Sequence, residues 1–540
     1  MKYSLLKRIV RCAGLVSVSP ANVGIAGQAR NDVRQVSDDV RQACNDVGGK
    51  LKFALLVFFL TGALFSSFAQ TTLTIEMALD IAEENNPQLR NSKLNLERTQ
   101  FLLDAQRAAL KSNFSLNVSP FAYSQNRNFD ARVAEWFTEK NLASEGTFRV
   151  DQPILLTGGS VSLVNRFGWQ QREAETVTGL NANKAFFNNL SIRYDQPLFT
   201  YNQRKMALER LEYDHENSGI SYALQRLNTE SRITSQFYNV YMAQNTLAIR
   251  HEEFENAKTN FEIIKDKVDL GLSPREELFQ AELNLASAES TFETSTVSLE
   301  NAKDALKQTL GIPMSENIDV VANIVVTTMF VDPVIAIESG LSSRMELRQR
   351  EINMELADLN MITVKAQNEF KGDLSLSIGI SGDDRNFGNI YQTPTQSPRI
   401  AVTFNVPIFD WGEKRARIRA QEAAQTIAQL DYETAIVDIE LNIRATLRRL
   451  NNLRLQIGIA EKNVQNAQQT YELNQIRYRE GELTGLQMSQ YQVQLSSART
   501  NYISAQIDYK TELLNLKILT LYDFENDSAI VPIRELRIEN

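Results

Sequence analysis

The chain is poor in the residues that carry most enzyme chemistry. Its 540 residues include 2 histidines and 2 cysteines, and both cysteines, Cys12 and Cys44, lie near the N-terminus. Beyond them there is no thiol and no Ser-His-Asp order, so a nucleophilic catalyst is not expected. His251 and Glu255 share a helix turn, but a zinc site needs about three protein ligands. We therefore expect a protein that is not an enzyme and that binds no metal and no cofactor.

Long apolar runs are absent too, apart from one near the N-terminus. The stretch from Phe53 to Phe65 follows two lysines and precedes small residues, and it is too short for a comfortable membrane-spanning helix. This is the pattern of a signal peptide, which we place at residues 49–69 with cleavage before Gln70. Residues 1–48 are interpreted as an over-extended reading of the start codon, and a native N-terminal extension is the alternative.

Positive charge is in deficit. The formal net charge is −9, and residues 1–69 carry 9 Lys and Arg against 4 Asp, so removing this leader leaves −9 − 5 = −14. A strongly acidic exported chain is not expected to bind nucleic acid.

The second half of the sequence repeats the first. Apolar and small residues spaced by three and four, from Leu278 to Leu306, recur 210 residues later from Met488 to Leu516 (488 − 278 = 210). This is the spacing of helices that pack knobs into holes. The repeat predicts two similar structural units from one ancestral duplication.

The offset changes upstream and so locates an insertion. Lys111 and the residues after it match Lys371 and its successors at an offset of 371 − 111 = 260, which leaves 260 − 210 = 50 extra residues in the first copy. We divide the chain into a first repeat at 70–332 with an insertion at about 125–190, a second repeat at 333–522, and a tail at 523–540.

Each repeat combines long helices with short strands. In the first, Thr74 is the predicted N-cap of a helical stretch that Pro87 ends or kinks, and a rod of about 100 Å runs from Asn202 to about Val268. A reversal and a return helix to Leu310 follow. The second repeat is predicted to have helices over 333–369, 414–478 and from the reversal at Gly481 to 521.

The predicted strands alternate in polarity. Leu374, Leu376, Ile378 and Ile380 are separated by serine and glycine, and the segments 114–123 and 399–406 alternate similarly. This pattern fits a half-buried sheet on a soluble core, or a membrane barrel with lipid outside and water inside.

Export and the lack of a globular core beside the rods favour the barrel. A chain with four to six strands cannot close one, because about eight are needed, so several chains must contribute. The insertion, with possible extra strands at 148–150 and 161–163, is predicted to lie on the outer rim.

The ordered set of motifs resembles the TolC family of outer-membrane efflux proteins. Each rod is preceded by a Pro-(Leu/Ile)-Phe strand end, with Pro197 and Phe199 in one copy and Pro407 and Phe409 in the other. The resemblance covers Leu73 to Tyr522. It implies a mainly α fold with a membrane β part: a homotrimer whose α-helical barrel crosses the periplasm and continues into a shared β-barrel surrounded by outer-membrane lipid.

The resemblance also implies a gate where the helices reverse. The tip glycines are Gly271 and Gly481, and Tyr478 occupies the place of a tyrosine whose hydrogen bond helps to hold family members closed. An acidic position after the first tip appears as Glu277, beside Glu276.

This chain departs from the family pattern at the second tip. Gln487 and Gln490 replace paired aspartates, and Leu483 replaces an arginine. A ring of amides should not bind cations as a ring of carboxylates does, so a cation block is not expected.

The sequence thus predicts a passive exit duct in the cell outer membrane. Such a duct serves a tripartite efflux or type I secretion system, and it receives cargo from an inner-membrane pump through a periplasmic adaptor, the membrane fusion protein. The alternative is a periplasmic or surface coiled-coil scaffold without channel activity.

Overall fold

The computed structural model describes residues 71–131, 134–176, 179–322, 324 and 326–529. The chain divides into two units, Met1–Thr71 and Thr72–Asn540, and the second unit contains the helical rods and the large sheet. The predicted leader at 1–69, with its signal peptide, lies outside the described residues. The end of the predicted tail, from 530, does so as well.

The first helices begin where the sequence predicts them. Helix α3 (Ile75–Asn85) is capped by Thr74, whose Oγ1 accepts a hydrogen bond from the backbone N of Met77 at 3.4 Å. Helix α4 (Pro87–Ala109) has Pro87 at its first position, where its missing N–H costs nothing. The buried Asn86 caps α4 and also donates to the carbonyl of Thr309, at 2.6 Å.

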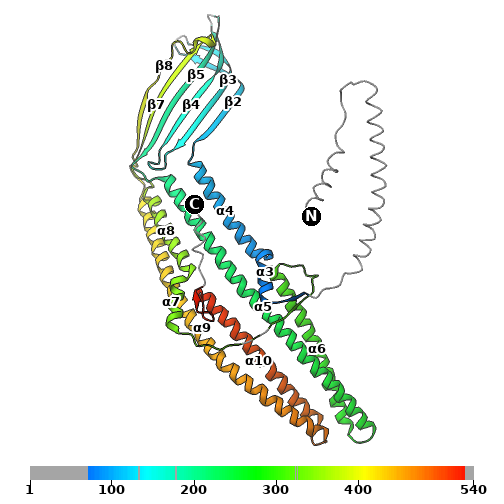
Figure 1. The fold of residues 1–540 in the computed structure, drawn as a ribbon. Coiled ribbons are helices and arrows are strands. Elements are labelled where there is room, and N and C mark those ends of the chain that lie inside the picture. The colour runs from blue at the N-terminus through cyan, green and yellow to red at the C-terminus, as the bar shows by residue number, and fades with distance from the viewer. Residues whose placement is uncertain (1–70, 132–133, 177–178, 323, 325, 530–540) are drawn as a thin grey trace, which may run out of the picture. The chain divides into compact units, whose positions relative to one another are not determined.

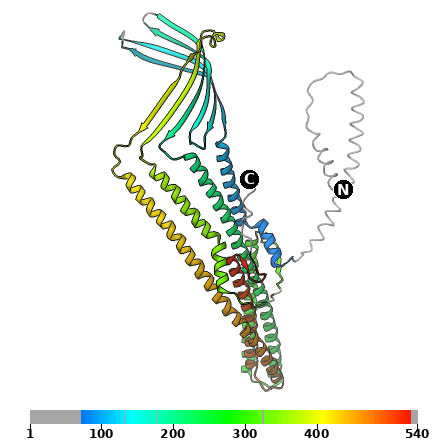
Figure 2. The same ribbon diagram turned by 60° about the vertical axis from the view of Figure 1, so that its left-hand side comes forward.

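The rods form two helical hairpins of identical length. Helices α5 (Gln203–Asp269) and α9 (Glu413–Arg479) have 67 residues each, and α6 (Arg275–Leu310) and α10 (Gly485–Thr520) have 36 each. Their starts differ by 413 − 203 = 485 − 275 = 210, the offset found in the sequence. Figures 1 and 2 show both reversals at the end of the helices that is remote from the sheet.

The helical stretch predicted over 333–369 is broken. Helix α7 (Pro333–Ser343) ends before Arg344, whose backbone is extended, and α8 (Met345–Lys365) begins after it. No proline or glycine marks this point. Arg344 fixes the bend through its guanidinium, which donates to Glu346 at 2.6 Å and to the carbonyl of Leu519 at 3.3 Å.

The upstream offset also needs correction. The starts of α3 and α7, and those of α4 and α8, differ by 333 − 75 = 345 − 87 = 258 rather than 260. The short strand motif is thus two residues out of register, and the excess of the first copy is 258 − 210 = 48 residues. An even shift leaves the alternation of strand faces unchanged.

The strands form one antiparallel sheet at one end of the helices (Figure 1). Its order is β2-β3-β4-β5-β7, and β8 and β9 both pair with β7. The strands are β2 (Asn113–Asp130), β3 (Glu135–Pro153), β4 (Ser160–Thr176), β5 (Gly179–Leu198), β7 (Lys371–Asp384), β8 (Thr395–Gln396) and β9 (Arg399–Asn405).

The insertion is therefore a hairpin of this sheet and not a rim loop. Strands β3 and β4 pair along most of their length, from Thr138 opposite Glu175 to Pro153 opposite Ser160. Sequence alternation is weak here because one face of β3 carries Gly146, and the ring of Phe167 on β4 fills the space that a side chain would take. Such an aromatic cover of a strand glycine is a known way to hold register.

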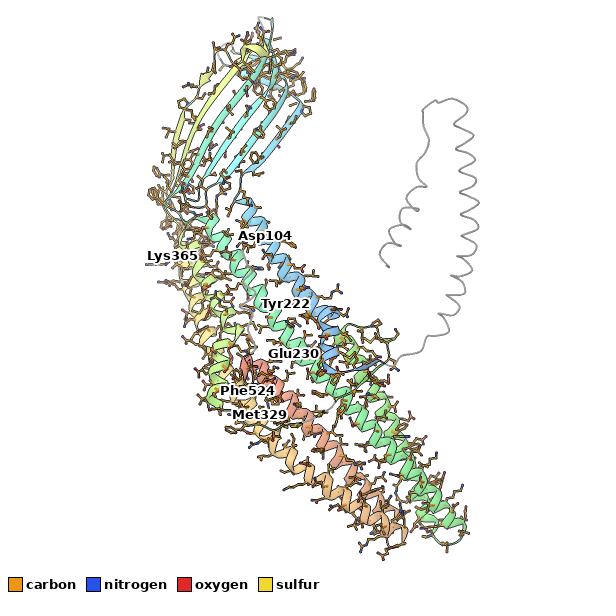
Figure 3. The ribbon with its side chains drawn as sticks, in the orientation of Figure 1. Asp104, Tyr222, Glu230, Met329, Lys365 and Phe524 are labelled. Carbon is orange, nitrogen blue, oxygen red and sulfur yellow. The ribbon has the colours of Figure 1, made fainter. Side chains whose placement is uncertain are left out.

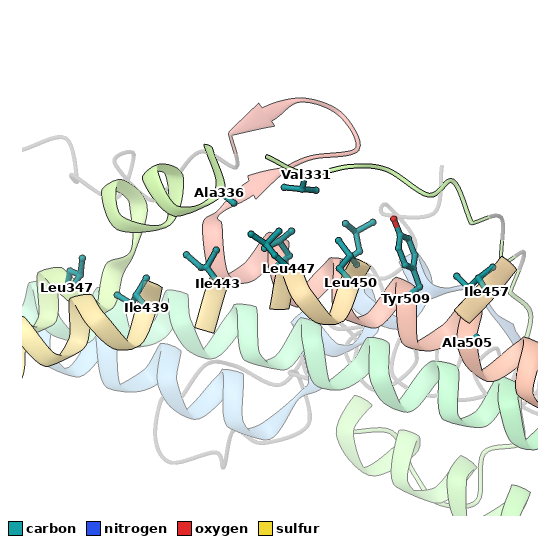
Figure 4. Close-up of a cluster of buried hydrophobic side chains, with 12 residues drawn as sticks. Val331, Ala336, Leu347, Ile439, Ile443, Leu447, Leu450, Ile457, Ala505 and Tyr509 are labelled. Atoms are coloured by element: carbon teal, nitrogen blue, oxygen red, sulfur yellow. The ribbon is translucent and has the colours of Figure 1, made fainter. Parts of the chain in front are cut away.

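Two buried clusters occupy equivalent places in the repeats. One includes Ile233 and Leu306, and the other includes Ile443 and Leu516, which lie 210 residues further on. Figure 4 shows the second cluster, with Tyr509 fully buried beside Leu450. Short strands accompany them: β1 (Thr71–Leu73) pairs with β6 (Ile318–Val320), and β10 (Tyr522–Asp523) pairs with β11 (Ser528–Ala529).

The segment that links the two repeats and the segment after α10 cover the second cluster. Met329 and Phe524, both labelled in Figure 3, pack against it, and the Tyr509 hydroxyl accepts a hydrogen bond from the Met329 backbone N at 3.1 Å. This hydrogen bond and its full burial show that Tyr509 serves in packing. Within the described residues, no helix combines the length and the apolarity that crossing a membrane requires.

Candidate gate at the helix tips

Both reversals use the same backbone geometry. Gly271 and Gly481 have φ of 71° and 81°, a left-handed conformation that favours glycine. The N–H three residues past each helix end bonds back, from Leu272 to the Lys267 carbonyl at 2.7 Å and from Glu482 to the Arg477 carbonyl at 2.9 Å. A Cβ at either glycine would meet no atom within 4 Å, so the backbone alone selects glycine.

Tyr478 connects the two hairpins. Its hydroxyl donates a hydrogen bond to Oδ1 of Asn260 on α5, and Lys267 Nζ lies 5.9 Å from its ring centroid. Burial raises the pKa of Tyr478, and the nearby carboxylate of Glu277 adds to the effect. The sequence singled out Tyr478 and Glu277, but the hydrogen-bond partner is Asn260, which no local pattern marks.

Gly485 allows α10 to approach α5 at the same place. A Cβ on Gly485 would lie 3.1 Å from Nδ2 of Asn260 and 3.2 Å from Cδ1 of Ile264. Such contacts are tighter than ordinary van der Waals distances. The glycine at the start of α10 therefore lets the helices meet, and Asn260 is positioned for Tyr478.

Three of the remaining predicted tip residues, Gln487, Gln490 and Glu276, stand apart from this contact. Gln487 closes a capping box with Thr484, because its Oε1 accepts from the Thr484 backbone N at 3.0 Å. Gln490 and Glu276 are exposed, whereas Glu277 is half-buried. Both glutamates lie in the first turn of α6, where negative charge is favourable.

A second polar contact lies further from the tips. Arg499 on α10 forms an ion pair with Glu252 on α5, at 3.0 Å between Nη1 and Oε2, and also donates to Gln468 on α9 at 2.9 Å. Three helices therefore converge on one guanidinium. Sequence reasoning missed it, because the contact depends on how the two hairpins cross.

The hairpins meet over a groove of about 380 Å³ that is lined by both polar and apolar side chains. Its lining includes Asn256, Asn284, Gln475 and Gln492, besides Tyr478. Separating a junction of mixed polarity exposes less apolar surface than opening a hydrophobic core of equal area, so it costs less. The arrangement suits a contact that opens and closes.

The predicted strand-to-helix junctions carry exposed aromatic rings. Phe199 follows β5 with a positive φ of 59° and packs on Phe370, with ring centroids 5.3 Å apart. Phe409 packs on Trp411 at 4.8 Å, and Trp411 is 91% exposed. Exposed aromatics at the end of a sheet are typical of the interfacial girdle of membrane strands.

The two prolines end their strands. Pro197 is the second-last residue of β5, opposite Asp373 on β7, and Pro407 follows the end of β9. Asp410 then accepts hydrogen bonds from the backbone N of Gly412 and of Lys414, at 3.0 and 3.1 Å. These bonds hold the pKa of Asp410 below its usual value and satisfy the start of α9.

Among the described residues, no group of three His, Cys, Asp or Glu side chains is placed to hold a metal ion. The His251 ring packs on Phe292 instead, with centroids 5.3 Å apart.

Comparison with known proteins identifies a domain in the second repeat. Residues 336–520 match the family model described as outer membrane efflux protein. An uncharacterized protein of Haemophilus influenzae is 16% identical over 354 residues, which cover 64% of this chain and 74% of that protein. The probable outer membrane lipoprotein SilC of Salmonella typhimurium is 18% identical over 53% of this chain and 62% of its own length.

Solved structures share the fold. The CmeC outer membrane channel of Campylobacter jejuni has a TM-score of 0.63 at 16% identity, covering 83% of this chain and 85% of that one. The open state of the MtrE outer membrane channel of Neisseria gonorrhoeae has a TM-score of 0.60 at 16% identity, covering 83% and 88%. These neighbours are channels and not enzymes. Residues 336–520 are an outer membrane efflux protein domain, and 83% of the chain has the fold of a solved outer membrane channel, in agreement with the resemblance to the TolC family and with the outer-membrane location that the sequence predicted.

Proposed function

We propose that three copies of this chain form a passive exit duct through the outer membrane. The observation that carries the proposal is the two-faced sheet with two free edges. Ile400, Val402 and Phe404 on β9 point to one face and are exposed by 77%, 49% and 53%. Their apolar side chains suit lipid, as they do in membrane barrels.

The other face of the sheet is polar. It carries Arg193 paired with Asp195 at 2.9 Å, and Arg149 paired with Asp151 at 2.6 Å. Arg166 and Glu145 form a further pair on the same face. Each arginine is balanced by a carboxylate, so these pairs give a water-filled lumen without adding net charge to it.

The free edges require a partner. Strand β2 and strand β9 lie at opposite ends of the sheet, and the sheet has too few long strands to close, since about eight are needed. Pairing β2 of one copy with β9 of the next satisfies both rows of backbone groups. Three copies in a ring close the barrel.

Exposed apolar side chains on α4 and α9 also indicate contact with a second copy of the chain. Helix α4 exposes Leu94 and Phe101, seven residues apart, by 61% and 69%. Helix α9 exposes Ile427, Leu430 and Val437 by 59%, 55% and 54%. Apolar stripes at coiled-coil spacing are expected to be buried against another helix, and in the ring a second copy supplies it.

The proposed duct has its gate at the tips. The Tyr478–Asn260 and Arg499–Glu252 contacts hold the second hairpin to α5 in the closed state. A periplasmic adaptor and an inner-membrane pump supply cargo and bias the tips towards opening. The chain itself performs no chemistry.

Lysine placed on each face of one strand tests the proposal. Val402→Lys places a charge on the apolar face, which costs about 2 kcal/mol or more in lipid, whereas Thr403→Lys adds the same charge to the polar face. We expect Val402→Lys alone to abolish recovery of trimers from outer membranes. Equal recovery of both variants, or a wild-type chain found as a soluble periplasmic monomer, would favour the scaffold instead.

A further inference from the structure

The internal repeat relates the interface between α10 and α5 within the chain to the outer sides of α6 and α9. The four helices of the two hairpins contact one another in the order α6, α5, α10, α9. An offset of 210 converts α10 into α6 and α5 into α9. The α10–α5 interface therefore has an equivalent between α6 and an α9, and the α9 that meets the free flank of α6 belongs to a second copy.

Charged residues also occupy equivalent positions of the two interfaces, but with opposite sign. Arg499 on α10 pairs with Glu252 on α5. The equivalent positions are 499 − 210 = 289 and 252 + 210 = 462, which carry Glu289 and Lys462. Both side chains are exposed. Both interfaces therefore have one positive and one negative residue at this position, although the signs are exchanged between the two helices.

Apolar residues show that the flank is built to be covered. Ser489 and Val493 on α10 line the groove against α5. Their equivalents on α6, 210 residues earlier, are Phe279 and Leu283, which are 65% and 64% exposed. Larger apolar side chains therefore stand at the equivalent positions, where the described part of the chain leaves them exposed.

The partner flank on α9 shows the same feature. Ile263 on α5 lines the groove inside the chain, and its equivalent on α9 is Leu473, which is 65% exposed. Exposed apolar side chains on two flanks that the repeat makes complementary indicate an interface. Each flank fits the other, so the occupant is another copy of this chain.

We propose that Glu289 of one copy pairs with Lys462 of its neighbour, and that this pair sets the register between chains at the level where Arg499 and Glu252 set it within a chain. The inference rests on the trimer proposed above. It adds the register of the chain-to-chain contact, which trimer formation alone does not fix.

Cross-linking tests the register directly. In a full chain with Cys12→Ser and Cys44→Ser, the pair Glu289→Cys and Lys462→Cys is treated with a short bismaleimide in detergent. We expect covalent dimers and trimers on a denaturing gel. The matched pair Glu252→Cys and Arg499→Cys should link within one chain and run as a monomer, and each single variant at 289 or 462 should give no multimer.

The outcomes separate this inference from the proposed function. Trimers by light scattering without cross-linked multimers from the 289/462 pair would overturn the register and leave the duct intact. A monomer by light scattering would overturn the duct itself, and with it the chain-to-chain pair.

Charge reversal gives a second readout. Glu289→Lys or Lys462→Glu alone places like charges opposite each other, and each should shorten the lifetime of the trimer in detergent several-fold. The double reversal should restore it. Failure of the double reversal to restore the lifetime would contradict a direct pair.

Discussion

The hydroxyl of Tyr478 on α9 donates a hydrogen bond to the amide oxygen of Asn260 on α5, across 218 residues of sequence. Each residue lies in a different rod, close to the tip of its hairpin. Gly485 lets the hairpins approach at this point. The tips of the two hairpins are therefore joined by a contact within one chain, between the two repeats.

Removing this hydroxyl should loosen the tips. One hydrogen bond contributes about 1 kcal/mol, so Tyr478→Phe is expected to raise the open population about fivefold. Single-channel recording in a planar bilayer measures it. Tyr522→Phe, which removes a hydroxyl bonded to Asp527 far from the tips, should leave conductance unchanged. Equal conductance of Tyr478→Phe and the wild type would remove this tyrosine from the gate.

Replacing either of two helical glycines in the second hairpin by alanine should have different effects on channel opening. At Gly485 a Cβ would press on Asn260 and Ile264, whereas at Gly458 it would meet nothing within 4 Å. Gly485→Ala is therefore expected to increase channel opening. Gly458→Ala should raise thermal stability by about 0.5–1 kcal/mol through helix propensity, with conductance unchanged. The same conductance for both variants would argue against a close approach at Gly485.

The Arg499–Glu252 ion pair should matter to gating more than a similar pair inside a hairpin. Partly exposed pairs contribute about 0.2–1 kcal/mol, so Arg499→Gln is expected to raise the open population by up to about fivefold, with a smaller effect at high salt. Arg449→Gln is the control, because Arg449 pairs with Glu512 at 2.7 Å within the α9–α10 hairpin. A control that opens the channel equally would show that the effect is only loss of stability.

Local signals in the sequence sufficed for the helices. Thr74, Pro87 and the two tip glycines act through their own backbone neighbours, and the period of the rods extends over many turns. The bend at Arg344 has no local signal in the sequence, because the residue bonds to a distant carbonyl, that of Leu519.

The possible strands at 148–150 and 161–163 lie in β3 and β4, but the full length of this hairpin and the gate partner were missed for related reasons. Gly146 relies on Phe167 of the next strand to complete its face, so β3 alone does not alternate clearly. Asn260 becomes a partner of Tyr478 only when α5 and α9 are placed side by side. The candidate tyrosine could be predicted from its distance to a tip glycine, but its acceptor could not.

The end of α10 should be sensitive to acid. Burial opposes ionisation of Asp523, but hydrogen bonds from Lys517 and Asn526 prevail and lower its pKa from 3.8 to about 2. Its contribution is therefore present above pH 3.8 and is lost as the pH falls through about 2. Asp523→Asn should cost about 2 kcal/mol at pH 7 and much less near pH 2, measured by thermal unfolding.

The exposed Asp508 provides the control for this prediction. Asp508→Asn should change stability little at either pH. A destabilisation by Asp523→Asn that does not depend on pH would mean that packing, and not the charge, is the contribution of this side chain.

Conductance of the purified wild-type protein in a planar bilayer tests the central claim most directly. A trimeric duct closed at its tips should insert as discrete channels of small unit conductance, which rises when the contacts at Tyr478 and Arg499 are removed together. A trimer that leaves the bilayer electrically silent in both forms would contradict the account.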